Sequence, residues 1–245
     1  MSARITLATA LRVLTQLRRD RRTVALLLLV PSLLMVLLRY VFNDSPAVFD
    51  RIGLPLLGVF PFITMFLVTS VAMLRERTSG TLERLLTTPL GKLDLLLGYG
   101  LAFAFTAALQ AGIASATAYW LLGLDTAGSA WLVVAVAVAD AILGMALGLF
   151  VSAFARTEFQ AVQFMPAVVL PQVLLCGLFT ARDSMAGWLE AISNVMPLTY
   201  VVEALGEVGQ SADVTGTLVR DFGIVLGAAL ACLVLAAATL RRRTS

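Results

Sequence analysis

Six long runs of apolar residues are spaced along the chain, and each is long enough to cross a membrane as a helix. A membrane-spanning helix needs about 20 consecutive, mostly apolar residues. The runs cover approximately residues 23–42, 52–74, 95–122, 131–154, 160–180 and 220–240. This pattern predicts an all-α integral membrane protein with six transmembrane helices, folded as a single transmembrane domain over residues 1–245.

Residues 2–22, before the first run, are amphipathic rather than apolar. Leu7 and Leu11 fall on one face of a helix, whereas Arg12 and Arg19 fall on the other. This pattern predicts an N-terminal amphipathic helix that lies in the membrane interface. A disordered basic leader, which would serve only to set orientation, is the alternative.

Residues 181–219, between the fifth and sixth runs, contain two short apolar patterns that cannot span a membrane. The first forms a stripe with Trp188 near its start, and Pro197 opens the second, because proline suits the first turn of a helix. We therefore expect short external re-entrant helices before span six. The residues assigned to this element are Trp188, Pro197, Tyr200 and Glu203.

Composition excludes a soluble globular protein. Sixty per cent of the residues are hydrophobic and 13% are charged, against roughly 45–50% and about 25% in soluble domains. The net charge of +3 is concentrated near the ends and in one loop. That distribution indicates contact with a membrane surface and no role in binding nucleic acid.

Lysine and arginine are unevenly distributed between the two sides of the predicted membrane domain. Cytoplasmic loops of membrane proteins carry an excess of these residues. The leader, residues 75–94, Arg156 and the C-terminal arginines hold all but four of the 18. The four others are Arg39, Arg51, Arg182 and Arg220. This asymmetry predicts a multi-pass protein with both termini in the cytoplasm and residues 181–219 outside.

The residues needed for catalysis and for nucleotide or metal binding are missing from the sequence. The chain has no histidine and no glycine-rich phosphate loop followed by lysine. No Cys/His cluster has the spacing of a zinc site. We therefore expect no catalytic, cofactor-binding or metal-binding residues in this chain and no enzymatic activity of its own.

Asp140 falls near the middle of the fourth run, where a charged side chain costs at least about 2.5 kcal/mol. Gln110 or Gln163 could supply a structural hydrogen bond to it, and a role in the translocation path or in proton transfer is the alternative. Gly144 and Gly148 form a Gly-xxx-Gly step in the same run, which predicts close helix packing within the subunit or across a dimer.

The loop between the second and third runs has an unusual sequence. Residues 75–89 read Arg-Glu-Arg-Thr-Ser-Gly-Thr-Leu-Glu-Arg-Leu-Leu-Thr-Thr-Pro. A short helix is expected over Thr81–Leu86, and Pro89 stops it. Its apolar face, which could enter a groove on a partner, comprises Leu82, Leu85 and Leu86. A solvated loop that merely carries positive charge is the alternative.

This loop resembles the signature of the type-2 ATP-binding-cassette (ABC) exporter permeases, in which an acidic-basic stretch leads into Gly-Thr-Leu-Glu and then Leu and Thr-Pro. The resemblance implies a cytoplasmic coupling helix that docks into a cleft of a separate ATPase subunit, where ATP and Mg²⁺ are bound. The coupling residues it implies are Glu76, Thr81, Leu82, Glu83, Arg84, Leu85 and Leu86. It also implies a second permease subunit, identical or related.

A second stretch, Asn194–Leu205, is similar to the Asn-Pro-Leu-Thr-Tyr and Glu/Asp-Ala-Leu element of the same family. Met196 replaces the usual asparagine before Pro197, and Gly206 stands where a basic residue often follows. With the six spans and the amphipathic leader, the resemblance covers essentially the whole chain.

The resemblance implies the permease subunit of an ATP-driven exporter in a bacterial inner membrane. The daunorubicin-type multidrug branch is the most similar in general build, and it implies an amphipathic or lipophilic substrate, drug-like or lipid-like. A polysaccharide or glycolipid exporter permease is the alternative within the family. A proton-coupled secondary transporter that uses Asp140 and a membrane enzyme acting on lipids are alternatives from other classes.

Overall fold

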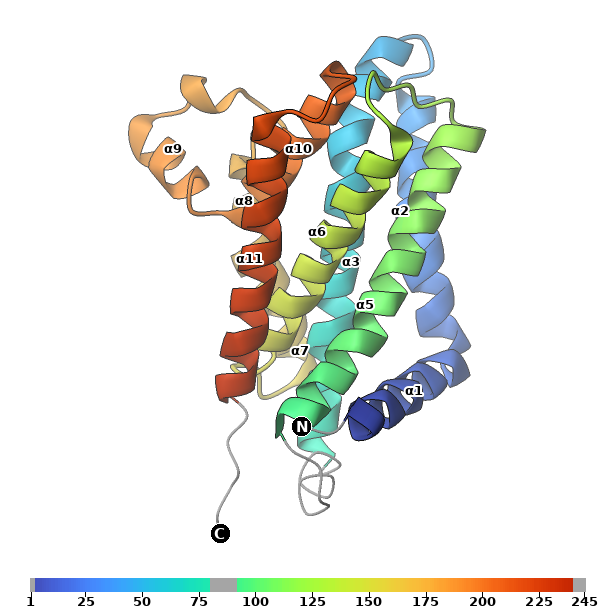
Figure 1. Ribbon diagram of the computed structural model, residues 1–245, viewed down its shortest axis with the longest axis vertical. Helices are drawn as coiled ribbons and strands as arrows, with labels where there is room; N and C mark the ends of the chain where they lie inside the picture. Colours follow the sequence, from blue (N-terminus) through green and yellow to red (C-terminus); the bar gives the residue numbers. More distant parts are fainter. Residues whose placement is uncertain (1–2, 80–91, 240–245) are drawn as a thin grey trace.

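The computed structural model describes residues 3–79 and 92–239, and all regular structure in these ranges is helical (Figure 1). The helices are α1 (Ala3–Arg19), α2 (Arg21–Val41), α3 (Pro46–Thr78), α5 (Lys92–Ala116), α6 (Ala130–Val151), α7 (Glu158–Phe164), α8 (Leu170–Leu175), α9 (Gly187–Ser193), α10 (Pro197–Gln210) and α11 (Gly216–Thr239). The π-helical turn η1 (Thr117–Leu121) continues α5, the π-helical turn η2 (Met165–Val169) joins α7 to α8, and the 3-10 turn η3 (Arg182–Ser184) precedes α9. The prediction of an all-α protein is confirmed.

Within the described ranges, six helical segments are long and apolar enough to cross a membrane, as the sequence predicted. They are Arg21–Val41, Pro46–Thr78, Leu97–Leu121, Ala130–Val151, Glu158–Leu175 and Gly216–Thr239. The second is longer than expected at both ends. It begins at Pro46, since proline's missing N–H group is not needed in a first turn, and it continues to Thr78. The fifth ends at Leu175 rather than near residue 180. Gly177 follows with a φ of +93°, a conformation that few other residues adopt.

Helices α3 and α6 form the centre of the bundle, and α6 is the most buried of the six spans. The two glycines of the Gly-xxx-Gly step lie at their contact. A Cβ atom on Gly148 would be 2.5 Å from the carbonyl oxygen of Phe66, and one on Gly144 would overlap the backbone of Phe62. The predicted close packing therefore occurs within one subunit, because only glycine leaves room for the backbones to approach this closely.

The N-terminal helix lies across one end of the bundle (Figure 1). It exposes Leu7 and Leu11 and buries Val13 against the other helices. Helix α1 ends at Arg19, and Asp20 caps the next helix by accepting a hydrogen bond from the backbone N–H of Thr23 at 3.1 Å. The predicted amphipathic helix is therefore present, and α1 and α2 meet at a sharp elbow.

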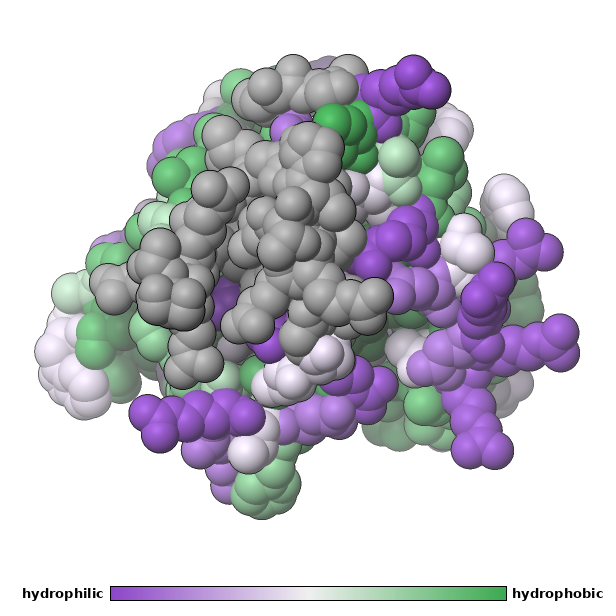
Figure 2. Space-filling model, turned by 90° about the horizontal axis from the view of Figure 1, so that it is seen from below, coloured by the Kyte–Doolittle hydropathy of each residue, from purple (hydrophilic) through white to green (hydrophobic). Residues whose placement is uncertain are grey.

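We call the end of the bundle that carries α1 the basic end. Helices α3 and α11 finish there, at Thr78 and Thr239, and α5 begins there at Lys92 (Figure 1). Figure 2 views this end and shows hydrophilic side chains projecting from it. The opposite, distal end carries the α2–α3 connection and α10. The described chain thus starts and finishes at the same end, as the prediction of two cytoplasmic termini requires.

Candidate functional site

Three side chains join α1, α3 and α5 at the basic end. Arg12 on α1 donates a hydrogen bond of 2.5 Å to the hydroxyl of Tyr99 on α5, and its guanidinium lies 3.7 Å from a carboxylate oxygen of Glu76 on α3. The Glu76 side chain is only 13% exposed, and Tyr99 is buried. We call these three residues the Arg12 junction. It connects α1 to the two helices between which residues 80–91 lie in the chain.

Close packing of α1 on the start of α5 accompanies this junction. A Cβ atom on Gly98 would lie 2.6 Å from Cβ of Thr9 and 3.0 Å from the carbonyl oxygen of Thr6, so the missing side chain at Gly98 lets Thr9 and the backbone of α1 pack directly against α5. One turn nearer the start of α5, the buried carboxylate of Asp94 accepts a hydrogen bond of 3.3 Å from the hydroxyl of Thr6. A displacement of the first turns of α5 would therefore be transmitted directly to α1.

The sequence identified only one member of the Arg12 junction. Glu76 was assigned through the loop motif, whereas Arg12 was placed on the polar face of the leader and Tyr99 fell within an apolar run. A basic residue near the middle of an interfacial helix is a weak signal, because most such residues face solvent. The pairing depends on an approach between segments that are 87 residues apart.

A second ion pair joins the end of α3 to the start of the fifth span. The guanidinium of Arg75 donates to both carboxylate oxygens of Glu158, at 2.8 and 2.9 Å. Both side chains are more than half exposed, so solvent screening limits the static stabilisation from this pair to about 0–1 kcal/mol. Its two-point geometry nevertheless fixes the orientation of the α3 terminus relative to α7.

The whole of the predicted coupling helix, Thr81–Leu86, lies outside the described residues. Of the seven residues assigned to ATPase coupling, Glu76 is described, and its side chain belongs to the Arg12 junction. The others, Thr81 to Leu86, fall in the range 80–91, so their role remains a prediction from the sequence motif.

A cavity of about 840 Å³ opens beside the Arg12 junction, between α1, α2, α3 and α5. Its lining is mostly apolar and includes Leu67, Val71 and Phe103, and the charged side chains of Arg75 and Glu76 also contribute. Binding sites for drug-sized molecules span roughly 300–1,000 Å³ and combine an apolar lining with a few polar groups. The cavity therefore has the size and the chemical character of a site for an amphipathic molecule.

Asp140 is fully buried where α6 meets α3 and α10. Its Oδ2 atom would lie 3.1 Å from a Cβ atom on Gly58 of α3, and that same point is close to Leu205 and Val201 of α10. Neither carboxylate oxygen has a hydrogen-bond partner among the residues that the structure describes. A buried carboxyl group without a partner is costly, which makes this position a candidate for function.

Neither glutamine suggested as a partner reaches Asp140. The buried side-chain amide of Gln110 donates to the carbonyl oxygen of Leu27 at 2.8 Å and to the hydroxyl of Thr64. It therefore ties α5 to α2 and α3. Gln163 lies on the exposed surface of α7. The expectation of a hydrogen bond from either residue to Asp140 is wrong, because each side chain faces a different part of the bundle.

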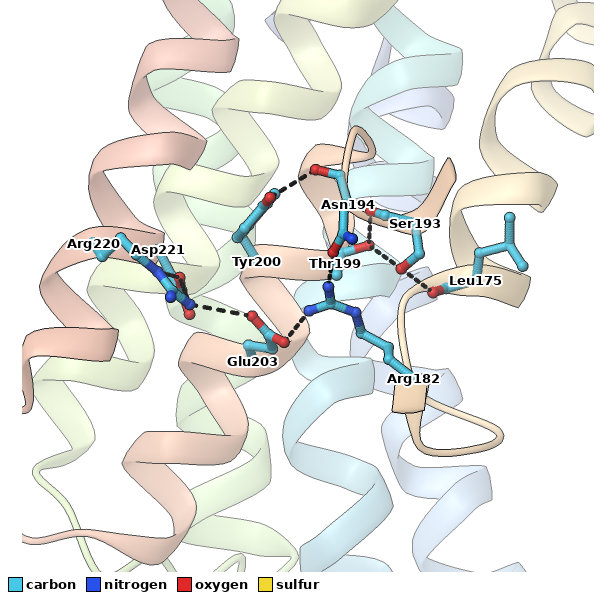
Figure 3. Close-up of polar contacts among 9 residues, drawn as sticks. All are labelled: Leu175, Arg182, Ser193, Asn194, Thr199, Tyr200, Glu203, Arg220 and Asp221. Atoms are coloured by element: carbon cyan, nitrogen blue, oxygen red, sulfur yellow. Dashed lines mark hydrogen bonds and ion pairs between the residues drawn. The ribbon is translucent and has the colours of Figure 1, made fainter. Parts of the chain in front are cut away.

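At the distal end, an ionic cluster connects α10 to α11 and to η3 (Figure 3). Arg182 of η3 contacts both Glu203 of α10 and the side-chain carbonyl of Asn194. Arg220 of α11 lies 3.6 Å from the other oxygen of Glu203 and 2.8 Å from the buried carboxylate of Asp221. Glu203 is therefore the link between the short helices and the last span.

Uncharged hydrogen bonds brace the turn between α9 and α10 (Figure 3). The hydroxyl of Tyr200 donates to the carbonyl oxygen of Asn194 at 2.6 Å, and that of Thr199 donates to the carbonyl oxygen of Ser193 at 2.9 Å. The Ser193 hydroxyl in turn donates to the carbonyl oxygen of Leu175 at 2.7 Å, at the end of α8. These bonds give the asparagine, threonine and tyrosine of the second sequence motif a structural role.

The other residues assigned to the external element occupy separate positions. Pro197 is the first residue of α10, as its sequence context predicted, and that helix continues to Gln210. Trp188, on α9, is 67% exposed. The structure thus brings Tyr200 and Glu203 into one braced region and leaves Trp188 on the surface.

Comparison with known proteins finds several transporter permeases among the relatives of this chain. The probable multidrug ABC transporter permease YbhR of Escherichia coli (strain K12) is 28% identical over 148 residues, which cover 60% of this chain and 40% of that protein. The linearmycin resistance permease protein LnrN of Bacillus subtilis (strain 168) is 25% identical over 150 residues, or 61% of this chain and 38% of LnrN. ABC transporter G family member 20 of Dictyostelium discoideum is 24% identical over 166 residues, or 68% of this chain and 23% of that protein. The matched region spans less than half the length of each relative.

The family comparison covers a larger part of the chain. The sequence pattern described as ABC-2 type transporter matches residues 6–208, from α1 through most of α10. That range includes five of the six spans, the Arg12 junction and the braced α9–α10 region. The chain belongs to the ABC-2 type transporter family.

Proposed function

We propose that this chain is the membrane-embedded permease subunit of an ATP-driven exporter. The observation that carries the proposal is the Arg12 junction, which ties α1 to the two helices on either side of the coupling motif. Together with the family match, the junction explains why the coupling motif lies between α3 and α5, because these are the two helices that Arg12 bonds to α1. ATP and Mg²⁺ would be held by a separate ATPase subunit, and a second permease subunit would complete the transporter.

The junction suggests how a movement at the coupling segment would spread. Residues 80–91 connect the end of α3 to the start of α5, and both helices are bonded to Arg12. A push on that segment would therefore move α1, α3 and α5 together rather than bending one helix alone. For ATP to drive transport, nucleotide binding must favour one arrangement of these helices over another through a difference in binding free energy.

The cargo proposed is an amphipathic or lipophilic molecule, drug-like or lipid-like. The cavity of about 840 Å³ beside the junction offers apolar walls together with the charged groups of Arg75 and Glu76. Two of the relatives are named as multidrug and linearmycin resistance permeases. The location proposed is a bacterial inner membrane, with the basic end in the cytoplasm, in agreement with the positive-inside rule.

Assembly and transport assays test this proposal. The double variant Leu82→Ala/Leu85→Ala removes two side chains from the apolar face of the coupling motif. It should weaken binding of the ATPase subunit by about 1–3 kcal/mol per buried anchor. Glu83→Ala changes a residue outside that apolar face, so it should weaken binding of the ATPase subunit less than the double leucine variant does. It should lower the rate of transport more than the rate of ATP hydrolysis. Normal assembly, hydrolysis and export in both variants would contradict the assignment.

A second candidate function is proton-coupled transport, and one observation favours it. Asp140 is fully buried and has no hydrogen-bond partner among the described residues. A carboxyl group in such a place can bind and release a proton during a transport cycle. Transport in proteoliposomes distinguishes the two functions: an ATP-driven exporter works without a proton gradient, whereas the alternative requires one.

A further inference from the structure

A groove of about 430 Å³ lies between α2 and α5 and begins at the α1–α2 elbow. Its walls are apolar, with Leu28 from α2 and Phe105 and Leu109 from α5. Phe105 and Leu109 are 60% and 46% exposed. Arg18 and Arg21 line the groove at the elbow. The groove is therefore charged at one end and apolar along the rest.

The depth of the groove matches the upper part of a lipid chain. Arg21 and Leu28 are seven residues apart on α2, which corresponds to about 10 Å along the helix axis at 1.5 Å per residue. Helix α2 enters the predicted membrane at Arg21, since α1 lies across the basic end (Figure 1). The arginines thus lie at the depth of lipid phosphates, and Leu28 lies at the depth of the acyl chains.

The charge at the elbow is positive and largely uncompensated. Arg19 and Arg22 each directly follow one of the two groove arginines in the sequence, and within the described residues none of the four is placed in a salt bridge. Asp20 is the one acidic residue among them. Its carboxylate accepts hydrogen bonds from the backbone and the hydroxyl of Thr23, and these bonds lower the pKa of Asp20. Asp20 therefore caps α2 and leaves the four guanidiniums available.

We propose that this groove is a binding site for an anionic phospholipid of the leaflet at the basic end. Its phosphate would accept hydrogen bonds from the guanidiniums of Arg18 and Arg21, and one acyl chain would lie along Leu28, Phe105 and Leu109. Arginine suits phosphate because its planar donors can bond two oxygens together. Basic pockets between membrane helices on the cytoplasmic side are a recognised form of lipid head-group site.

Charge favours a lipid over a second copy of this chain in the groove. A two-fold pairing through this face would bring two groups of four arginines to the same depth and close together. An anionic lipid neutralises the elbow instead of adding to its charge. Bound there, it would also contact α1, α2 and α5 together and so steady the helix that carries Arg12. The binding does not depend on the proposed transport function, so the two can fail independently.

The test measures binding of fluorescent phosphatidylglycerol to the purified full-length chain in neutral detergent, with phosphatidylcholine of the same acyl chains for comparison. Arg18→Gln/Arg21→Gln should weaken binding of phosphatidylglycerol about 25-fold, from roughly fivefold for each arginine. The matched control is Arg19→Gln/Arg22→Gln, which removes the same charge from outside the groove and should weaken binding much less. An equal loss in both pairs would mean diffuse attraction and would overturn the proposal, as would no loss in either.

A second pair of variants tests the apolar part of the groove. Ala25→Trp places a large side chain in the groove and keeps all four arginines, so it should abolish the preference for phosphatidylglycerol. Leu29→Trp is the control, because Leu29 is 62% exposed on α2 and does not line the groove. Unchanged binding in Ala25→Trp would overturn the proposal. So would disulfide cross-linking of two copies through Phe105→Cys in a variant lacking the native cysteines, because the groove would then be an interface between subunits.

Discussion

The ion pair of the Arg12 junction can be removed one charge at a time. Arg12→Gln and Glu76→Gln keep the approximate shapes of the side chains and delete the attraction between them. At the observed 3.7 Å, two unit charges attract by about 4 kcal/mol if the effective dielectric constant is about 20. Arg12 is 32% exposed and both groups lose hydration on pairing, so we expect a net coupling of about 1–2 kcal/mol.

A double-mutant cycle isolates this coupling from the other contacts of each residue. The unfolding free energies of the wild type, both single variants and the double variant are measured in mild detergent with increasing dodecyl sulfate. Arg12→Gln should cost more than Glu76→Gln, because it also weakens the hydrogen bond to Tyr99. Additive effects, with a coupling near zero, would refute the pairing.

These four proteins, together with charge-reversed variants at the same two positions, test the proposed mechanism. In the complex with its ATPase, Glu76→Gln should lower transport more than ATP hydrolysis, because α3 would be less firmly attached to α1. The charge-reversed pair Arg12→Glu/Glu76→Arg should recover part of the transport that either reversal alone removes. If transport and hydrolysis fall in equal proportion in every variant, the junction stabilises the fold without transmitting movement.

Three further predictions concern other parts of the molecule. Gly148→Ala should destabilise the protein by about 1–3 kcal/mol in the same unfolding assay, because its Cβ atom would lie 2.5 Å from the carbonyl oxygen of Phe66; an unchanged stability would contradict the close packing of α3 and α6. Asp140→Asn should insert and fold with an unfolding midpoint no lower than that of the wild type, because it replaces a buried acid that has no described partner, and full transport by the variant at every pH would eliminate a proton-carrier role. In a variant lacking the native cysteines, a cysteine at Ser79 should react with a membrane-impermeant thiol reagent only from the cytoplasmic side and one at Asp213 only from outside; the reverse pattern would overturn the orientation.

The sequence by itself determined the spans and their approximate ends, since apolar length is a local property. No water is present in the membrane interior to bond the backbone N–H and C=O groups. A long apolar run therefore forms a helix, which satisfies these groups within the segment itself. The Gly-xxx-Gly step and Pro197 were also interpreted correctly, because small residues and proline restrict the backbone at their own positions. The loop motif and its neighbours identified the family before any contact was known.

Only the tertiary structure decided which polar groups meet. Arg12 lies on the polar face of an interfacial helix, and nothing nearby in the sequence indicates that it bonds to Tyr99 and Glu76. Gln110 was one of two residues suggested as a partner of Asp140, and it bonds instead to α2 and α3. Such pairings depend on the rotation of each helix about its axis and on its depth in the bundle. Those quantities are set by the packing of all the helices together, so they cannot be obtained from a single run of sequence.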